Sequence, residues 1–228
     1  MSDFFQLFQP GLRHLQEQRD LDKILVVEED AGGTGPKPMD LDSGKVVLRV
    51  PNRLVPPTPE PDDKDWTWVL QKPCAECGYV AATVHREDFA ALVRQAAAPW
   101  PEVLARPEAA VRPRPQVWSP LEYGCHVRDV LRVFEQRLAL MRTEVDPRFE
   151  NWDQDATALS ERYWDADPVI VASEILDAAE QHAASWERVR PADWGRPGRR
   201  SNGSVFTVET LGRYELHDLV HHLWDVRG

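Results

Sequence analysis

The segment from Phe206 to Val226 constrains the fold more than any other part of the chain. No proline interrupts it, and a threonine at position 207 is a residue type that caps helix N-termini. Its apolar residues recur at helical spacing, at Val208, Leu211, Leu219, Leu223 and Val226. The segment therefore predicts one long amphipathic helix.

Three histidines lie on this predicted helix. His217 and His221 are four residues apart, so their imidazoles leave the same face one turn from each other, whereas His222 points about 100° away. Such a pair is a two-ligand clamp for a metal ion that needs a third ligand. The alternative is a pair of core histidines that only form hydrogen bonds.

Composition excludes several classes of protein. The 228 residues suffice for one or two domains, and a net charge of −11 argues against a nucleic-acid-binding surface. No apolar run approaches the roughly 20 residues of a membrane span, and the N-terminus lacks the pattern of a signal peptide. Three cysteines do not make a disulfide framework, so we expect a cytoplasmic protein.

The chain divides near residue 60. Residues 1–60 are expected to be largely irregular, because Pro51–Asp63 is proline-rich and acidic and has few apolar groups to bury. The phrase Asp40–Lys45 resembles one in a small actinobacterial domain of unknown function, which implies no activity. Every basic residue after Lys72 is an arginine, and alanine and proline are abundant, as in proteins from GC-rich bacterial genomes.

Cys74 and Cys77 form a CxxC followed by Gly78, which is half of a zinc ribbon. The chain has no second CxxC, and Cys125 and His85 could complete a site only if the fold brings them near. Three interpretations stay open: a turn with free thiols, a small metal knuckle, and a redox pair. The helical sequence that follows does not offer the βαβ context of a thioredoxin-like motif.

Four helices are predicted between residues 65 and 227. The first covers 88–98, the second begins after the Ser119 cap and runs to about Thr143, and the third starts after Pro168. Polar segments at 146–155 and 191–203 are predicted to be loops. The predicted fold class is thus all-α, a four-helix bundle with a largely irregular N-terminal extension.

The stretch Trp118–His126 and the C-terminal pair His217 and His221 resemble the DinB-like metalloenzyme superfamily. The resemblance covers about residues 65–227. It implies a bundle in which His126, His217 and His221 hold one divalent metal, most simply Zn²⁺, with Ni²⁺ and Fe²⁺ as alternatives. Three imidazoles leave an open coordination position, as catalytic zinc sites do.

The same resemblance implies an activity: metal-dependent transfer of a low-molecular-weight thiol, here mycothiol, to an electrophilic small molecule. Carboxylates often orient metal-bound histidines, and the candidates for this role are Asp129, Asp218 and Asp225. Arg199 and Arg200 are candidates for contact with an anionic cosubstrate. The competing hypothesis is a non-catalytic metal-binding protein, linked to stress, that interacts with a partner. A homodimer is one candidate assembly.

Overall fold

The structure is a computed structural model that describes residues 56–57, 59, 61 and 64–227. The chain divides into two units, Met1–Val55 and Pro56–Gly228, and the described residues all belong to the second. Most of the irregular extension that the sequence predicts, residues 1–60, lies outside the described residues. Within the described part, no helix is long and apolar enough to cross a membrane.

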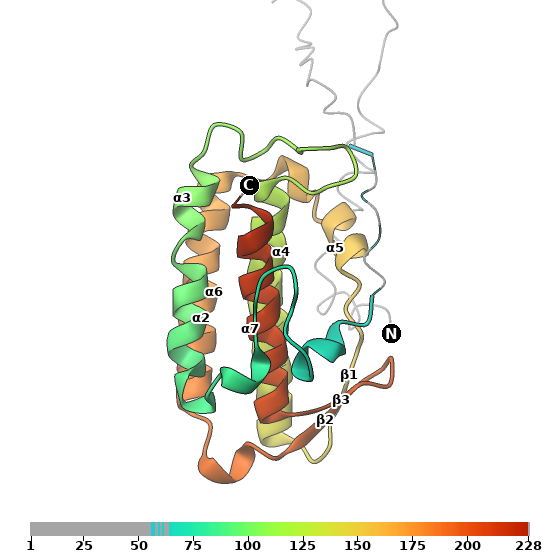
Figure 1. The fold of residues 1–228 in the computed structure, drawn as a ribbon, viewed down its shortest axis with the longest axis vertical. Coiled ribbons are helices and arrows are strands. Elements are labelled where there is room, and N and C mark those ends of the chain that lie inside the picture. Colours follow the sequence, from blue (N-terminus) through green and yellow to red (C-terminus); the bar gives the residue numbers. More distant parts are fainter. Residues whose placement is uncertain (1–55, 58, 60, 62–63, 228) are drawn as a thin grey trace, which may run out of the picture. The chain divides into compact units, whose positions relative to one another are not determined.

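Four helical rods form a bundle (Figure 1). They are α2 (Phe89–Ala97) continued by α3 (Trp100–Leu104), then α4 (Pro120–Thr143), α6 (Pro168–Glu187) and α7 (Val208–Asp225). Both α2 and α4 pack against α6 and α7, which closes the bundle. The prediction of a mainly helical protein with a four-helix bundle is therefore confirmed for this part of the chain.

Local sequence explains where the two central helices begin. Ser119 and Glu122 form a capping box in front of α4, with Pro120 at the first helical position, and Thr207 and Thr210 do the same for α7. An apolar stripe runs along α4 and is buried from end to end: Leu121, Val127, Val130, Leu131, Phe134, Leu138 and Met141. His126 lies among them and is also buried.

Short elements flank the bundle. They are the 3-10 helices η2 (Trp66–Leu70), η3 (Ala81–Thr83), η4 (Arg86–Asp88), η5 (Tyr163–Asp165) and η6 (Pro191–Asp193), together with helix α5 (Gln154–Ser160). Both η2 and η3 contact α7, so the segment that carries the CxxC lies against the C-terminal helix.

The two segments predicted to be loops instead contribute a small sheet. β1 (Arg148–Phe149) pairs parallel with β2 (Pro197–Arg200), which pairs antiparallel with β3 (Val205–Thr207). Strands of two to four residues are too short to show alternation, so the sequence carried no signal for them. The fold is all-α with this one addition.

Gly212 lets α7 pack closely against two aromatic side chains, Phe89 of α2 and Trp186 of α6. A Cβ at this position would lie 2.9 Å from the Trp186 ring and closer still to the Phe89 ring, both of which are buried. We expect Gly212→Ala to destabilise the protein by about 1–3 kcal/mol in urea unfolding, because overpacking outweighs the gain of about 1 kcal/mol in helix propensity. Gly195→Ala, which meets nothing within 4 Å, is the control. A more stable Gly212→Ala variant would contradict this packing.

Candidate metal centres and an adjoining cleft

Helix α7 presents two neighbouring stripes of potential metal ligands. Each stripe is a pair four residues apart, His217 with His221 and Asp218 with His222. The first pair is joined by two cysteines and the second by a histidine of α4. In each group the ligand atoms all lie within 4.8 Å of one another: Cys74, Cys77, His217 and His221 in one, and His126, Asp218 and His222 in the other.

The group of His126, Asp218 and His222 converges on one carboxylate oxygen. Oδ1 of Asp218 lies 3.4 Å from Nε2 of His126 and 3.3 Å from Nε2 of His222. Two nitrogen or oxygen ligands of a tetrahedral Zn²⁺, each at 2.0–2.2 Å, are separated by roughly 3.3–3.6 Å. The spacing therefore suits atoms that share a metal ion.

Hydrogen bonding supports the same interpretation. Both ring nitrogens of His126 and Oδ1 of Asp218 are buried and have no hydrogen-bond partner in the described part of the chain. Buried polar atoms without partners are rare and call for an explanation, such as an ion. Nδ1 of His222 lies 2.8 Å from the Asp225 carboxylate, the arrangement that usually orients a metal-binding imidazole.

The pKa shifts favour the metal-binding protonation states of His126, His217 and Asp218, but not that of His222. Burial lowers the pKa of His126, and it lowers the pKa of His217 to about 4, so both imidazoles are neutral at pH 7. Burial alone would raise the pKa of Asp218, but the adjacent imidazoles hold it far below its usual range. Burial opposes the charge on His222 as well, yet Asp218 and Asp225 raise its pKa to about 9. A metal ion would therefore replace a proton on His222.

The three histidines predicted to share one metal are divided between the two groups. His217 and His221 lie together, as their spacing predicts, but His126 lies with Asp218 and His222. Sequence reasoning set His222 aside because its side chain leaves the helix about 100° from His221. The spacing of Asp218 and His222 is the signal that could have found it, since these residues are also four apart.

The other candidate residues have different neighbours. Asp129 accepts hydrogen bonds from Arg128 and Tyr163, not from a histidine. Cys125 lies in the core, and burial raises the pKa of its thiol to about 12. Neither Cys125 nor His85 joins a ligand group among the described residues. Arg199 pairs with Asp146 at 2.8 Å.

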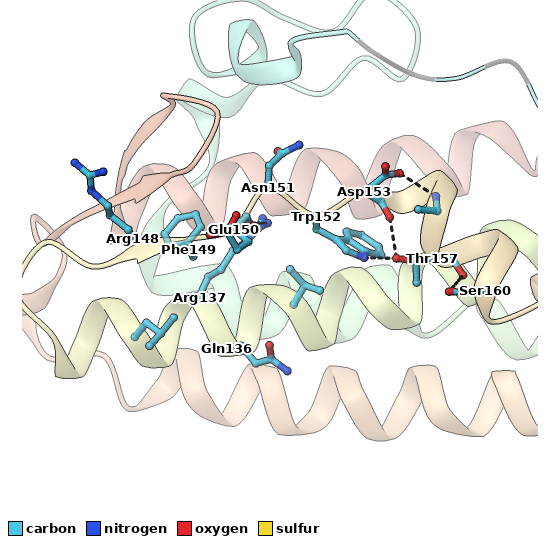
Figure 2. Close-up of a pocket in the computed structure, with 13 residues that line it drawn as sticks. Gln136, Arg137, Arg148, Phe149, Glu150, Asn151, Trp152, Asp153, Thr157 and Ser160 are labelled. Atoms are coloured by element: carbon cyan, nitrogen blue, oxygen red, sulfur yellow. Dashed lines mark hydrogen bonds between the residues drawn. The ribbon is translucent and has the colours of Figure 1, made fainter. Parts of the chain in front are cut away.

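A cleft of about 730 Å³ lies beside α4 (Figure 2), and its lining includes Trp152 but none of the three ligand residues His126, Asp218 and His222. Residues of α4, of the 148–153 segment and of α5 line it. Trp152 forms part of its wall and stacks on His126, with ring centroids 5.3 Å apart and planes within 6°. Nε1 of Trp152 donates to Thr157 Oγ1 at 2.8 Å, which fixes the ring between cleft and histidine.

Arg137 brings a buried positive charge to this cleft. Figure 2 shows it rising from α4 toward the segment that carries Glu150, whose carbonyl accepts a hydrogen bond from Nη2 at 3.2 Å. The side chain is 5% exposed and has no carboxylate in ion-pair range within the described part of the chain. Burial, and next the charge of Arg200, lowers its pKa to about 10. Arg200 itself donates to Asn202 and Ser204.

Comparison with solved structures identifies a protein whose fold is similar to this bundle. YfiT from Bacillus subtilis, described as a probable metal-dependent hydrolase with an unusual four-helix bundle topology, matches with a TM-score of 0.55 at 16% identity. The match covers 62% of this chain and 85% of that one. The bundle has the YfiT fold. This likeness supports the DinB-like fold predicted from the sequence.

The comparisons of sequence reach only the N-terminal part of the chain. Residues 7–48 match a family described as a family of unknown function (DUF6191). No curated protein matches the chain. The match spans the phrase at Asp40–Lys45 and, like it, implies no activity.

Proposed function

We propose that the protein is a metal-dependent enzyme whose centre is formed by His126, Asp218 and His222. The observation that carries the proposal is the convergence of three ligand atoms, two of them buried without hydrogen-bond partners. The Trp152 ring, which stacks on His126, also lines a cleft of about 730 Å³. Small-molecule sites range over about 300–1,000 Å³, so the cleft can hold a substrate of ordinary size.

Two histidines and one carboxylate are typical of catalytic rather than structural sites. Three protein ligands leave a coordination position open, and this set suits Zn²⁺ and also Fe²⁺. When bound, a divalent ion supplies positive charge that brings the pKa of a coordinated water or thiol toward neutrality. Asp225 would orient His222, and Trp152 would shield His126 from the open cleft.

The nucleophile in this proposal comes from outside the chain. Cys125 is the cysteine next to a proposed ligand, but it is buried and its pKa is raised to about 12. A buried, protonated thiol is a poor nucleophile. The resemblance to the DinB-like superfamily favours a low-molecular-weight thiol, mycothiol, as the attacking group, with an electrophilic small molecule as acceptor.

Arg137 indicates the chemical class of the substrate. The buried guanidinium lies 5.0 Å from the ring centroids of Phe134 and Phe149 and donates to the Glu150 carbonyl, but no carboxylate within the described part of the chain neutralises its charge. An anionic ligand would supply that partner. The planar fork of a guanidinium binds carboxylates and phosphates through two hydrogen bonds. We therefore propose that the substrate or the thiol carries an anionic group that binds Arg137 at the cleft.

Hydrolysis is the second candidate, because the bundle has the fold of a protein described as a probable metal-dependent hydrolase. The same three ligands would then hold a metal ion that activates a water molecule, and Arg137 would bind an anionic ester or amide. The two reactions differ in one requirement, since only thiol transfer depends on added thiol.

The deciding experiment measures consumption of a panel of electrophiles, esters and amides by the metal-loaded full chain. Each substrate is tested with mycothiol, bacillithiol, glutathione, cysteine or no thiol, with and without a chelator. We expect turnover that needs both metal and thiol. Metal-dependent turnover without thiol would select hydrolysis, and no metal-dependent turnover of any substrate would leave the non-catalytic hypothesis.

Once a substrate is found, Arg137→Gln tests how it binds. Hydrogen bonds to charged groups contribute about 1.5–3 kcal/mol, so we expect KM for an anionic substrate to rise roughly 10- to 100-fold with little change for a neutral analogue. Arg142→Gln is the control, because Arg142 lies on the same helix but outside the cleft lining. Equal effects on both analogues would contradict the role of Arg137.

A further inference from the structure

We propose that Cys74, Cys77, His217 and His221 form a second metal site, a closed tetrahedral zinc site that fastens the segment before the bundle onto α7. Four donors meet here: the two thiols of the CxxC segment and two imidazoles of α7. This is the Cys₂His₂ set that structural zinc sites use, and soft thiolates select zinc over the hard cations. The site is distinct from the one formed by His126, Asp218 and His222.

The donor spacing fits a tetrahedral ion. Sγ of Cys74 lies 3.8 Å from Nδ1 of His221, and all four donor atoms lie within 4.8 Å of one another. A sulfur at 2.3 Å and a nitrogen at about 2.05 Å from a tetrahedral Zn²⁺ would be roughly 3.6 Å apart. A shift of a few tenths of an ångström therefore brings the observed pair to bonding geometry.

The backbone between the cysteines folds as a tight turn that presents both thiols to α7. The amide of Gly78 donates to the Cys74 carbonyl at 2.9 Å, and the amide of Cys74 donates to the Tyr79 carbonyl at 2.9 Å. Gly78 has a φ of +75°, a conformation that glycine adopts without strain. The glycine after the CxxC is thus explained by the turn.

His221 is oriented as metal ligands usually are, and His217 offers an unpartnered nitrogen. The Glu76 carboxylate lies 3.3 Å from Nε2 of His221, so it can accept the proton of that nitrogen while Nδ1 faces Cys74. Nε2 of His217 is buried and has no hydrogen-bond partner in the described part of the chain. The Trp66 ring covers both imidazoles, with centroid distances of 5.4 and 5.1 Å.

A closed site of this kind has a structural consequence for its neighbour. His217 and His221 alternate along α7 with Asp218 and His222, so a zinc ion on one stripe fixes the rotation of the helix that carries the other. Four protein ligands leave no coordination position for substrate. The second ion therefore positions α7 and takes no part in chemistry.

The test is a Co²⁺ titration of the reduced, metal-free full chain. Cobalt occupies zinc sites and shows thiolate-to-metal charge-transfer absorption when sulfur coordinates. We expect this absorption to saturate with one bound ion, and a second ion to bind without adding to it. Zn²⁺ should displace Co²⁺ and so remove the absorption. It should also protect Cys74 and Cys77 from alkylation in the wild-type protein.

Variants separate the two sites. The double variant Cys74→Ser/Cys77→Ser should lose the absorption and one ion, whereas Cys125→Ala, which removes the remaining cysteine, should keep both. Asp218→Asn should keep the absorption even if the proposed catalytic centre fails. The inference would be overturned if wild-type protein showed no thiolate absorption, if zinc left both thiols open to alkylation, or if mass spectrometry found Cys74 and Cys77 joined as a disulfide. None of these wild-type measurements depends on a variant folding.

Discussion

Asp218→Ala is expected to remove the metal ion that binds without thiolate absorption and to lower turnover by on the order of a thousandfold or more. Oδ1 of Asp218 is the atom on which His126 and His222 converge, at 3.4 and 3.3 Å. Two imidazoles alone make a weak site, and a catalytic metal contributes several kcal/mol, with each 1.4 kcal/mol equal to a factor of ten in rate. Elemental analysis and initial rates at saturating metal measure both effects.

Asp225→Asn is the matched control for this experiment. Asp225 contacts Nδ1 of His222 and belongs to neither ligand group, so its loss should weaken metal binding by about 10- to 100-fold, and added metal should restore the rate. Added metal should not rescue Asp218→Ala. An Asp218→Ala protein that keeps full occupancy and full turnover would show that Asp218 is not a ligand.

Helical periodicity predicted the bundle because it reports which face of a helix is buried. The stripe from Leu121 to Met141 and the caps at Ser119 and Thr207 are local features, and local features can be read from one sequence. The same argument placed His217 and His221 on one face of α7. It could not determine which neighbour faces them, because that depends on how α7 is rotated against α4 and on where the preceding segment lies.

The division of the histidines illustrates this limit. Cys74 and His221 are 147 residues apart in sequence, and no spacing rule joins a CxxC to a helix so distant. Since the turn at Cys74 occupies the face of His217 and His221, His126 meets the adjacent stripe of α7 instead. The small sheet was missed for a related reason, because Arg148 pairs with Arg199, and helices α5 and α6 lie between the two residues in the sequence.

Glu215→Ala is expected to destabilise the protein by about 3–5 kcal/mol. Glu215 and His182 are both fully buried, with 2.8 Å between Nε2 of His182 and the carboxylate, and Nε1 of Trp186 lies 2.9 Å from the same imidazole nitrogen. Removing one member of a buried ion pair leaves the other charge without compensation, which costs about this much. Urea unfolding at pH 7 measures the loss. Glu209→Ala, a half-buried surface carboxylate on the same helix, should change stability by no more than about 1 kcal/mol.

The pair also predicts how stability depends on pH. Burial alone would lower the pKa of His182, but Glu215 and Glu135 raise it to about 9, and burial raises the pKa of Glu215. The folded pair therefore binds protons more tightly than the unfolded chain, where His has a pKa near 6.5, so its contribution is complete below that pH and is lost as pH rises toward 9. Glu215→Gln keeps the shape of the side chain and removes the charge, so its unfolding free energy should fall less steeply between pH 6.5 and 9 than that of the wild type. Parallel curves for the two proteins would mean that His182 does not carry this proton, and the buried contact would then be a hydrogen bond between neutral groups.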